Sequence, residues 1–152
     1  QPTINSLWLW GGGAPPAAIP PGFAGVWGNV PLMNGLARHY AIPQHALPAQ
    51  AEDLLSQTPH GSRQLLLLDS LAAPVHYQDG PAYRDALLDL EKHWFAPLRQ
   101  ALASRRLSSL RLEASTAYAA LSWHGRPIDQ WRLWQRPVTL AATARALAQS
   151  DA

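Results

Sequence analysis

The chain has 152 residues, of which 47% are apolar, and a formal net charge of only +2, which excludes a disordered chain and fits one domain of ordinary size. It has no cysteine, which excludes disulfides, zinc–thiolate centres and a cysteine nucleophile. Its basic residues are scattered arginines and a single lysine, so we expect neither a nucleic-acid partner nor a membrane-binding patch.

No segment reaches the roughly 20 apolar residues that a membrane-spanning helix needs, and no signal peptide is recognisable. We therefore expect a cytoplasmic protein without membrane contact. The sequence begins with Gln1 rather than Met, directly before a strand-like run. We interpret residues 1–152 as a single α/β domain and as a fragment of a longer chain.

The first predicted element is a buried strand over Ile4–Trp10 that stops at the glycines 11–13. Four prolines make Ala14–Gly22 a loop. A glycine-rich loop after a strand can hold a phosphate with its backbone amides. This one lacks both the G-x-G-x-x-G pattern and a P-loop lysine, so a tight, crowded turn is the simpler interpretation.

A short strand over Phe23–Trp27 follows and is ended by the turn Gly28-Asn29. Pro31 suits the first turn of a helix over Leu32–Tyr40. The next residues, AIPQHALP, predict an extended segment, and Ala49–Gln57 predicts a short helix with acidic residues near its positive end.

The segment RQLLLLDSL contains four consecutive leucines after a turn signal and predicts a strand buried on both faces, as in a parallel sheet. A long helix over Pro81–Ser104 comes next, with Asp79 as its N-cap and a kink or restart at Pro97. Its apolar residues recur at spacings of three and four and form one stripe: Tyr83, Leu87, Leu90, Trp94, Leu98 and Leu102.

The segment LSSLRLEAS predicts a third buried strand, and TAYAALSW either extends it or forms a hairpin partner across Ser115-Thr116. IDQWRLWQRP fits a strand or a helix, and Val138–Gln149 predicts a terminal amphipathic helix. Strands that alternate with helices indicate an α/β fold with a mainly parallel sheet flanked by helices on both faces.

Two carboxylates follow predicted strands. Asp69 ends the leucine-rich strand and Glu113 follows LRL. Carboxyl ends of neighbouring parallel strands are where α/β folds bind ligands, and two carboxylates there could share a cation. The simpler interpretation is that both residues are strand-end caps. No two histidines have the i, i+2 or i, i+4 spacing of metal ligands, so we expect neither a metal site nor a cofactor.

Aromatic and basic residues alternate near the C-terminus. Such side chains can stack on bases or on a partner's cations, or the rings can pack against the sheet beneath the arginine stems. The candidate partner-binding residues are Trp131, Arg132, Trp134 and Arg136.

Four segments together resemble the C-terminal half of the bacterial RpfE-type regulatory proteins, which are often labelled phosphoglycerate-mutase-like. These segments are PTINSLWLWGGG, LLLLDSL, LEKHWFAPLRQAL and DQWRLWQRP. A more remote similarity, in FAGVWGNVPLMNGLARHYAI, runs to the archaeal type of cofactor-independent phosphoglycerate mutase in the alkaline-phosphatase superfamily. The resemblance implies an α/β sheet flanked by helices, and a two-metal phosphoryl-transfer site if the ligands are present.

Key ligands of that superfamily are missing. His76 lies too far from Asp69 for the D-x-x-x-H pattern, Ala114 replaces a histidine, and Trp10 replaces an arginine. Two-metal catalysis needs several convergent ligands. We therefore expect a non-catalytic regulatory or ligand-binding domain, with no catalytic residues, that takes a small phosphorylated ligand or a protein partner. The expected pocket comprises Trp10, Gly11, Gly12, Gly13, Gly28, Asn29, Asp69 and Glu113.

Two alternatives remain open. An active metal-dependent phosphomutase or phosphatase would be completed by a missing N-terminal half, with Ser115 or Thr116 as nucleophile and Asp69 and Glu113 as metal ligands. An interaction module for protein or nucleic acid would use the C-terminal Arg/Trp segment instead. The sequence does not define the oligomeric state.

Overall fold

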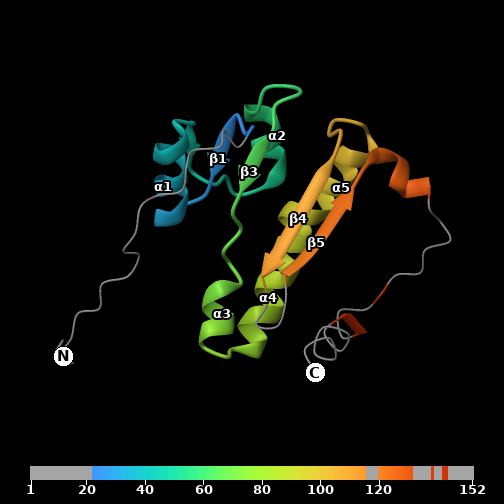
Figure 1. The fold of residues 1–152 in the computed structure, drawn as a ribbon. Helices are drawn as coiled ribbons and strands as arrows, with labels where there is room; N and C mark the ends of the chain where they lie inside the picture. Colours follow the sequence, from blue (N-terminus) through green and yellow to red (C-terminus); the bar gives the residue numbers. More distant parts are fainter. Residues whose placement is uncertain (1–21, 116–119, 132–137, 139–141, 144–152) are drawn as a thin grey trace.

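The computed structural model of the chain describes residues 22–115, 120–131, 138 and 142–143 (Figure 1). The elements follow in chain order: β1 (Gly25–Trp27), α1 (Pro31–Tyr40), β2 (Gln44–His45), α2 (Ala51–Gln57), β3 (Gln64–Leu66), α3 (Ala72–His76), α4 (Gly80–Leu90), a π-helical turn (Glu91–Phe95), α5 (Ala96–Ala103), β4 (Leu110–Ser115), β5 (Ala120–Gly125) and a 3₁₀ helix (Pro127–Trp131). The predicted strand over residues 4–10 lies outside the described residues.

Three short strands form a parallel sheet in the order β2-β1-β3, with Val26 of β1 opposite Gln44 of β2 and Leu65 of β3. Helix α1 joins β1 to β2, and α2 then joins β2 to β3 on the other side of β1. Right-handed crossovers that run in opposite directions leave from opposite faces of a sheet. Accordingly, α1 and α2 lie on either side of β1 and β3 (Figure 1).

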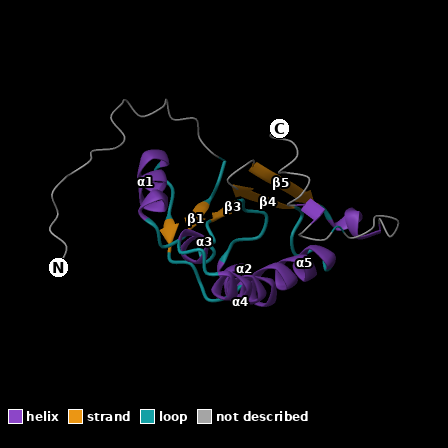
Figure 2. Cartoon of the chain, turned by 90° about the horizontal axis from the view of Figure 1, so that it is seen from below, coloured by secondary structure: helices purple, strands orange, loops and turns teal. Residues whose placement is uncertain are grey.

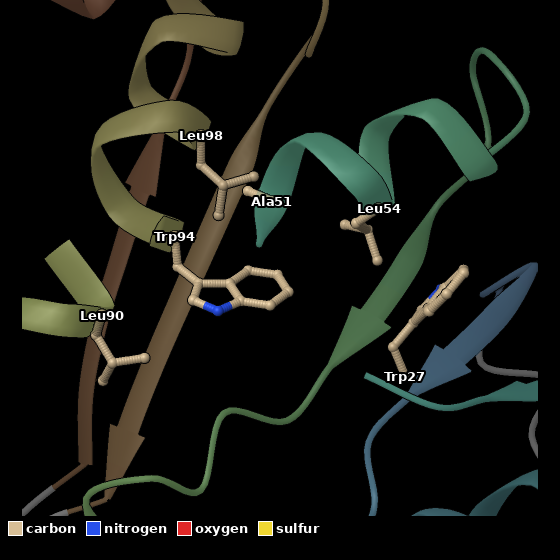
Figure 3. Close-up of a cluster of buried hydrophobic side chains, with 6 residues drawn as sticks. All are labelled: Trp27, Ala51, Leu54, Leu90, Trp94 and Leu98. Carbon is tan, nitrogen blue, oxygen red and sulfur yellow. The ribbon is translucent and has the colours of Figure 1, made fainter. Parts of the chain in front are cut away.

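Two apolar clusters cover the two faces of the parallel sheet. Val26 packs with Met33 and Ala37 of α1 and with Leu65 and Leu67. Trp27 belongs to the second cluster, on the face of α2 (Figure 3). Alternate leucines of the β3 segment, Leu66 and Leu68, pack against this cluster. The other buried members of this cluster are Ala51, Leu54, Leu90, Trp94 and Leu98. Successive residues therefore face opposite helices, as the period of a strand requires.

The prediction for the leucine run is only partly confirmed. Its residues do supply both faces of a parallel sheet, but the strand covers just Gln64–Leu66, and Leu65 to Leu68 are half-buried rather than buried. Among the described residues β3 pairs with β1 alone. A strand with one neighbour keeps one side open to solvent, so four leucines in a row overstate its burial.

The long helix has the predicted N-cap and the predicted restart. Asp79 Oδ1 accepts a hydrogen bond from the Ala82 N–H at 2.9 Å, and Pro97 lies in the first turn of α5. The Ala96 N–H donates to the Glu91 carbonyl, five residues back. A proline ring collides with the carbonyl four residues earlier, and the widened π turn makes room for it. A π turn rotates through a smaller angle per residue than an α-helix does. Residues four apart, Leu90, Trp94 and Leu98, therefore stay on the side of the helix that faces the core.

The prediction of a third buried strand is wrong. Within the described residues β4 pairs only with β5, in antiparallel register, and every β4 residue after Leu110 is exposed. The alternative of a hairpin partner for this strand is correct. Leu112 lies opposite Trp123, with the apolar residues on one face, whereas Arg111 and Glu113 lie on the other.

The ambiguous segment 128–137 begins as part of a 3₁₀ helix that ends at Trp131, and residues 132–137 lie outside the described residues. Of the predicted terminal helix, Ala142 and Thr143 are described and are helical. In the part of the chain that the structure describes, no helix is both long enough and apolar enough to cross a bilayer.

Candidate functional site

The chain places β2 on one side of β1 and β3 on the other, so the direction in which strands are added to the sheet reverses at β1. The chain leaves β1 through Gly28–Val30 towards α1, on one face, and leaves β3 through Leu67–Leu71 towards α3. In open α/β sheets the crevice beyond the carboxyl ends of two such strands is the usual ligand position. Three residues predicted for the pocket, Gly28, Asn29 and Asp69, belong to these two loops. The fold therefore brings them to one edge of the sheet.

Gly28 sits where three segments meet. Its N–H donates to the His45 carbonyl at 3.2 Å, and its own carbonyl accepts from Gln44 Nε2 at 3.3 Å. A Cβ built on Gly28 would lie 2.7 Å from Met33 Cγ and 3.4 Å from Leu67 Cβ. Close approach of α1 and of the end of β3 thus requires glycine here.

Asn29 holds the turn in place. Its Oδ1 accepts a hydrogen bond from the Leu47 N–H at 3.1 Å, which ties the β1–α1 loop to the segment after β2. The side chain is exposed. Asn29 therefore shapes the rim of the candidate site through its oxygen.

The N-terminus of α1 opens onto the same edge. Its N-cap, Val30, supplies no side-chain hydrogen bond, Pro31 occupies the first turn, and that turn carries no acidic residue. The partial positive charge at this end of the ten-residue helix is consequently not neutralised by a carboxylate of the helix itself. Leu32 in this turn is 65% exposed, so the helix end is accessible to solvent.

Asp69 lies on the second loop and is exposed. Its backbone carbonyl accepts the Ala72 N–H at 2.9 Å, which turns the chain into α3. The N-cap residue of α3 is Leu71, and that helix has no side-chain cap. The carboxylate of Asp69 therefore does not cap the helix that follows it.

Glu113 lies elsewhere in the fold. It occupies the middle of β4 in the hairpin, opposite Ser122, and its carboxylate is paired with the Arg111 guanidinium on the same face. The expectation that Glu113 ends a strand of the parallel sheet beside Asp69 is wrong, because β4 does not join that sheet within the described residues. Of the two candidate nucleophiles, Ser115 ends β4, and Thr116 lies outside the described residues.

Several predicted residues fall outside the part of the chain that the structure describes. Outside the described residues lie Trp10, Gly11, Gly12, Gly13, Arg132, Trp134 and Arg136, whereas Trp131 ends the 3₁₀ helix. Over the described ranges, no three histidine, aspartate or glutamate side chains gather closely enough to hold a metal ion.

Two hollows that the sequence interpretation missed border α5, one beside the segments that flank the hairpin and one beside β5. One, of about 670 Å³, includes Arg105, Ser108 and Arg126 in its lining, and the other, of about 510 Å³, includes Arg99 and Trp123. The available signal was the alternation in LRLEAS and ALSWHG, which predicts a hairpin with one apolar face above the helix. In Figure 2 the hairpin lies on the same side of the molecule as α5, away from α1.

Comparison of the chain with protein-family models, with curated proteins and with solved structures gives no match.

Proposed function

We propose that this chain is a non-catalytic, regulatory ligand-binding domain on a phosphoglycerate-mutase-like scaffold. It binds a small phosphorylated ligand at the carboxyl edge of β1 and β3. The observation that carries the proposal is the strand-order reversal at β1, which gathers Gly28, Asn29, Asp69 and the N-terminus of α1 at one edge.

The chemistry of this edge is suited to two ligand groups. The uncapped positive end of α1 favours a phosphate, which accepts a hydrogen bond from the Leu32 amide, since Pro31 has no N–H and the Met33 N–H donates to the Val30 carbonyl. The Asp69 carboxylate accepts hydrogen bonds from hydroxyl groups and repels a second phosphate. A phosphorylated polyol or sugar, with its phosphate towards α1 and its hydroxyls towards Asp69, satisfies both.

Binding without turnover follows from the composition of the two loops. Gly28–Val30 and Leu67–Leu71 contain one carboxylate, Asp69, and one hydroxyl, Ser70. Phosphoryl transfer requires a nucleophile, an activating base and cations or cationic side chains around the phosphate. The two loops do not supply that set, so the proposed site holds its ligand by hydrogen bonds and the helix dipole.

Leu32→Glu separates ligand binding from helix stability. A carboxylate in the first turn stabilises a helix by about 0.3–1 kcal/mol, whereas the same charge repels a bound phosphate. We expect a slightly higher melting temperature together with affinity for glycerol 3-phosphate that is several-fold weaker, measured by isothermal titration calorimetry. Leu32→Gln is the neutral control. Unchanged affinity in the glutamate variant would contradict a phosphate position at α1.

Asp69→Asn tests the second contact. Hydrogen bonds to a charged group contribute about 1.5–3 kcal/mol, so losing the charge should weaken glycerol 3-phosphate binding roughly 10- to 100-fold. Asp85→Asn, on the exposed face of α4, is the matched control and should bind normally.

Two results would overturn the proposal. If Arg126→Gln abolished binding while Asp69→Asn and Leu32→Glu did not, the ligand would occupy the hollow beside α5 instead. Release of inorganic phosphate from glycerol 3-phosphate in the presence of manganese, lost in Asp69→Ala, would establish the catalytic alternative.

A further inference from the structure

The outer edge of β4 is the one strand edge in the hairpin with a self-complementary sequence. Among the described residues β4 has β5 as its only strand neighbour, and Arg111 to Ser115 are all exposed. An exposed strand edge presents a row of backbone donors and acceptors that can pair with another strand. A two-stranded hairpin is also marginal by itself and gains stability from further strands.

We propose that β4 pairs with β4 of a second copy of this chain, antiparallel and about a two-fold axis at Leu112, to give a four-stranded sheet β5-β4-β4-β5. In this register Arg111 lies opposite the partner's Glu113, and Glu113 lies opposite the partner's Arg111. Leu110 meets the partner's Ala114. The interface is isologous, because the same strand supplies both sides.

Charge complementarity selects this occupant. Arg111 and Glu113 precede and follow Leu112 in the strand, and both lie on the face of β4 opposite to Leu112. They already form an ion pair within the chain. Antiparallel pairing about Leu112 keeps each charge next to its opposite, across the strands as well as along them. Opposite charges that face each other across a sheet are stabilising, and like charges are destabilising.

The apolar face of the hairpin supports the same register. Leu112 lies opposite Trp123 within the hairpin, and both side chains are half-exposed. Pairing about Leu112 extends this apolar pair into one row across the four strands. The row consists of Trp123, Leu112, the partner's Leu112 and the partner's Trp123. The edge of β5 offers no such match, since pairing it about Trp123 would set Ser122 against the partner's His124. The proposal does not depend on the ligand site.

Charge reversal tests the proposal in solution. Analytical ultracentrifugation of the chain should show a concentration-dependent dimer. Glu113→Arg, which sets arginine against arginine twice, should raise the dimer dissociation constant roughly tenfold or more, and Arg111→Glu should do the same. The double variant Arg111→Glu/Glu113→Arg restores complementarity and should dimerise like the unchanged chain. An equal mixture of the two single variants should form a heterodimer.

The control is Glu91→Arg, which breaks an exposed ion pair with Arg99 within the long helix, not on β4, and should leave the dimer unchanged. Circular dichroism of each variant separates loss of pairing from loss of folding. A chain that stays monomeric over the concentration series overturns the proposal, as does a dimer that Glu113→Arg leaves intact. It also fails if the two single variants, both folded, remain monomeric when mixed.

Discussion

Replacing Trp94 by alanine will lower the free energy of unfolding by about 3–5 kcal/mol, the range for truncating a buried aromatic side chain. Trp94 is only 4% exposed and lies in the cluster that joins the long helix to α2 and to the parallel sheet (Figure 3). The large loss is expected because the indole leaves a cavity between Leu98 of α5 and Ala51 and Leu54 of α2, and two separate helices cannot both close over it.

Urea denaturation followed by circular dichroism measures this loss. Tyr77→Ala is the aromatic control, because Tyr77 is 78% exposed and its removal should change the free energy of unfolding by less than about 0.5 kcal/mol. Equal losses in the two variants would mean that Trp94 is not part of the core.

The second large effect is expected at Val26, the one large side chain among the described residues that is fully buried, with 0% exposure. Val26 lies in the central strand, between Leu65 and the side chains of α1. Val26→Asp places a carboxylate with no charged partner inside this cluster. Burying an unpaired charge costs several kcal/mol, which is comparable to the whole stability of a domain. We expect the variant to be unfolded at neutral pH.

Val75→Asp provides the matched control, since Val75 in α3 is 61% exposed and should tolerate the same change. Amide chemical-shift dispersion in a proton–nitrogen NMR spectrum distinguishes the two outcomes. A dispersed spectrum for Val26→Asp would show that β1 is not central to the fold.

The elements that the sequence predicts well are those with a local chemical signal. Pro31 begins α1, Asp79 caps α4, and Pro97 restarts the long helix after a π turn. Each of these residues acts on its own backbone within one turn, so neighbouring residues are enough to predict its effect.

The wrong predictions concern segments whose structure depends on which distant strand they pair with. LRLEAS alternates apolar and charged residues, which is typical of a half-exposed strand, yet the α/β pattern favoured a buried one. Whether that strand joins the parallel sheet or a hairpin depends on its partner and not on its own residues. The sequence therefore predicts the wrong sheet for Glu113, which lies in the hairpin. Gly28, Asn29 and Asp69 were predicted one by one from strand ends, but the reversal at β1 that groups them is a property of strand order.

The run Leu65 to Leu68 has a consequence for how β3 finds its alignment. Sliding the strand by one residue exchanges the two faces, but here it would replace leucines by leucines, so apolar burial barely distinguishes the two alignments. The amide of Gln64 does distinguish them: its Oε1 accepts from Trp27 Nε1 and its Nε2 donates to Ser62 Oγ, both at 2.9 Å. A single polar side chain at the start of the strand thus fixes the register of β3, which its run of leucines alone would leave undefined.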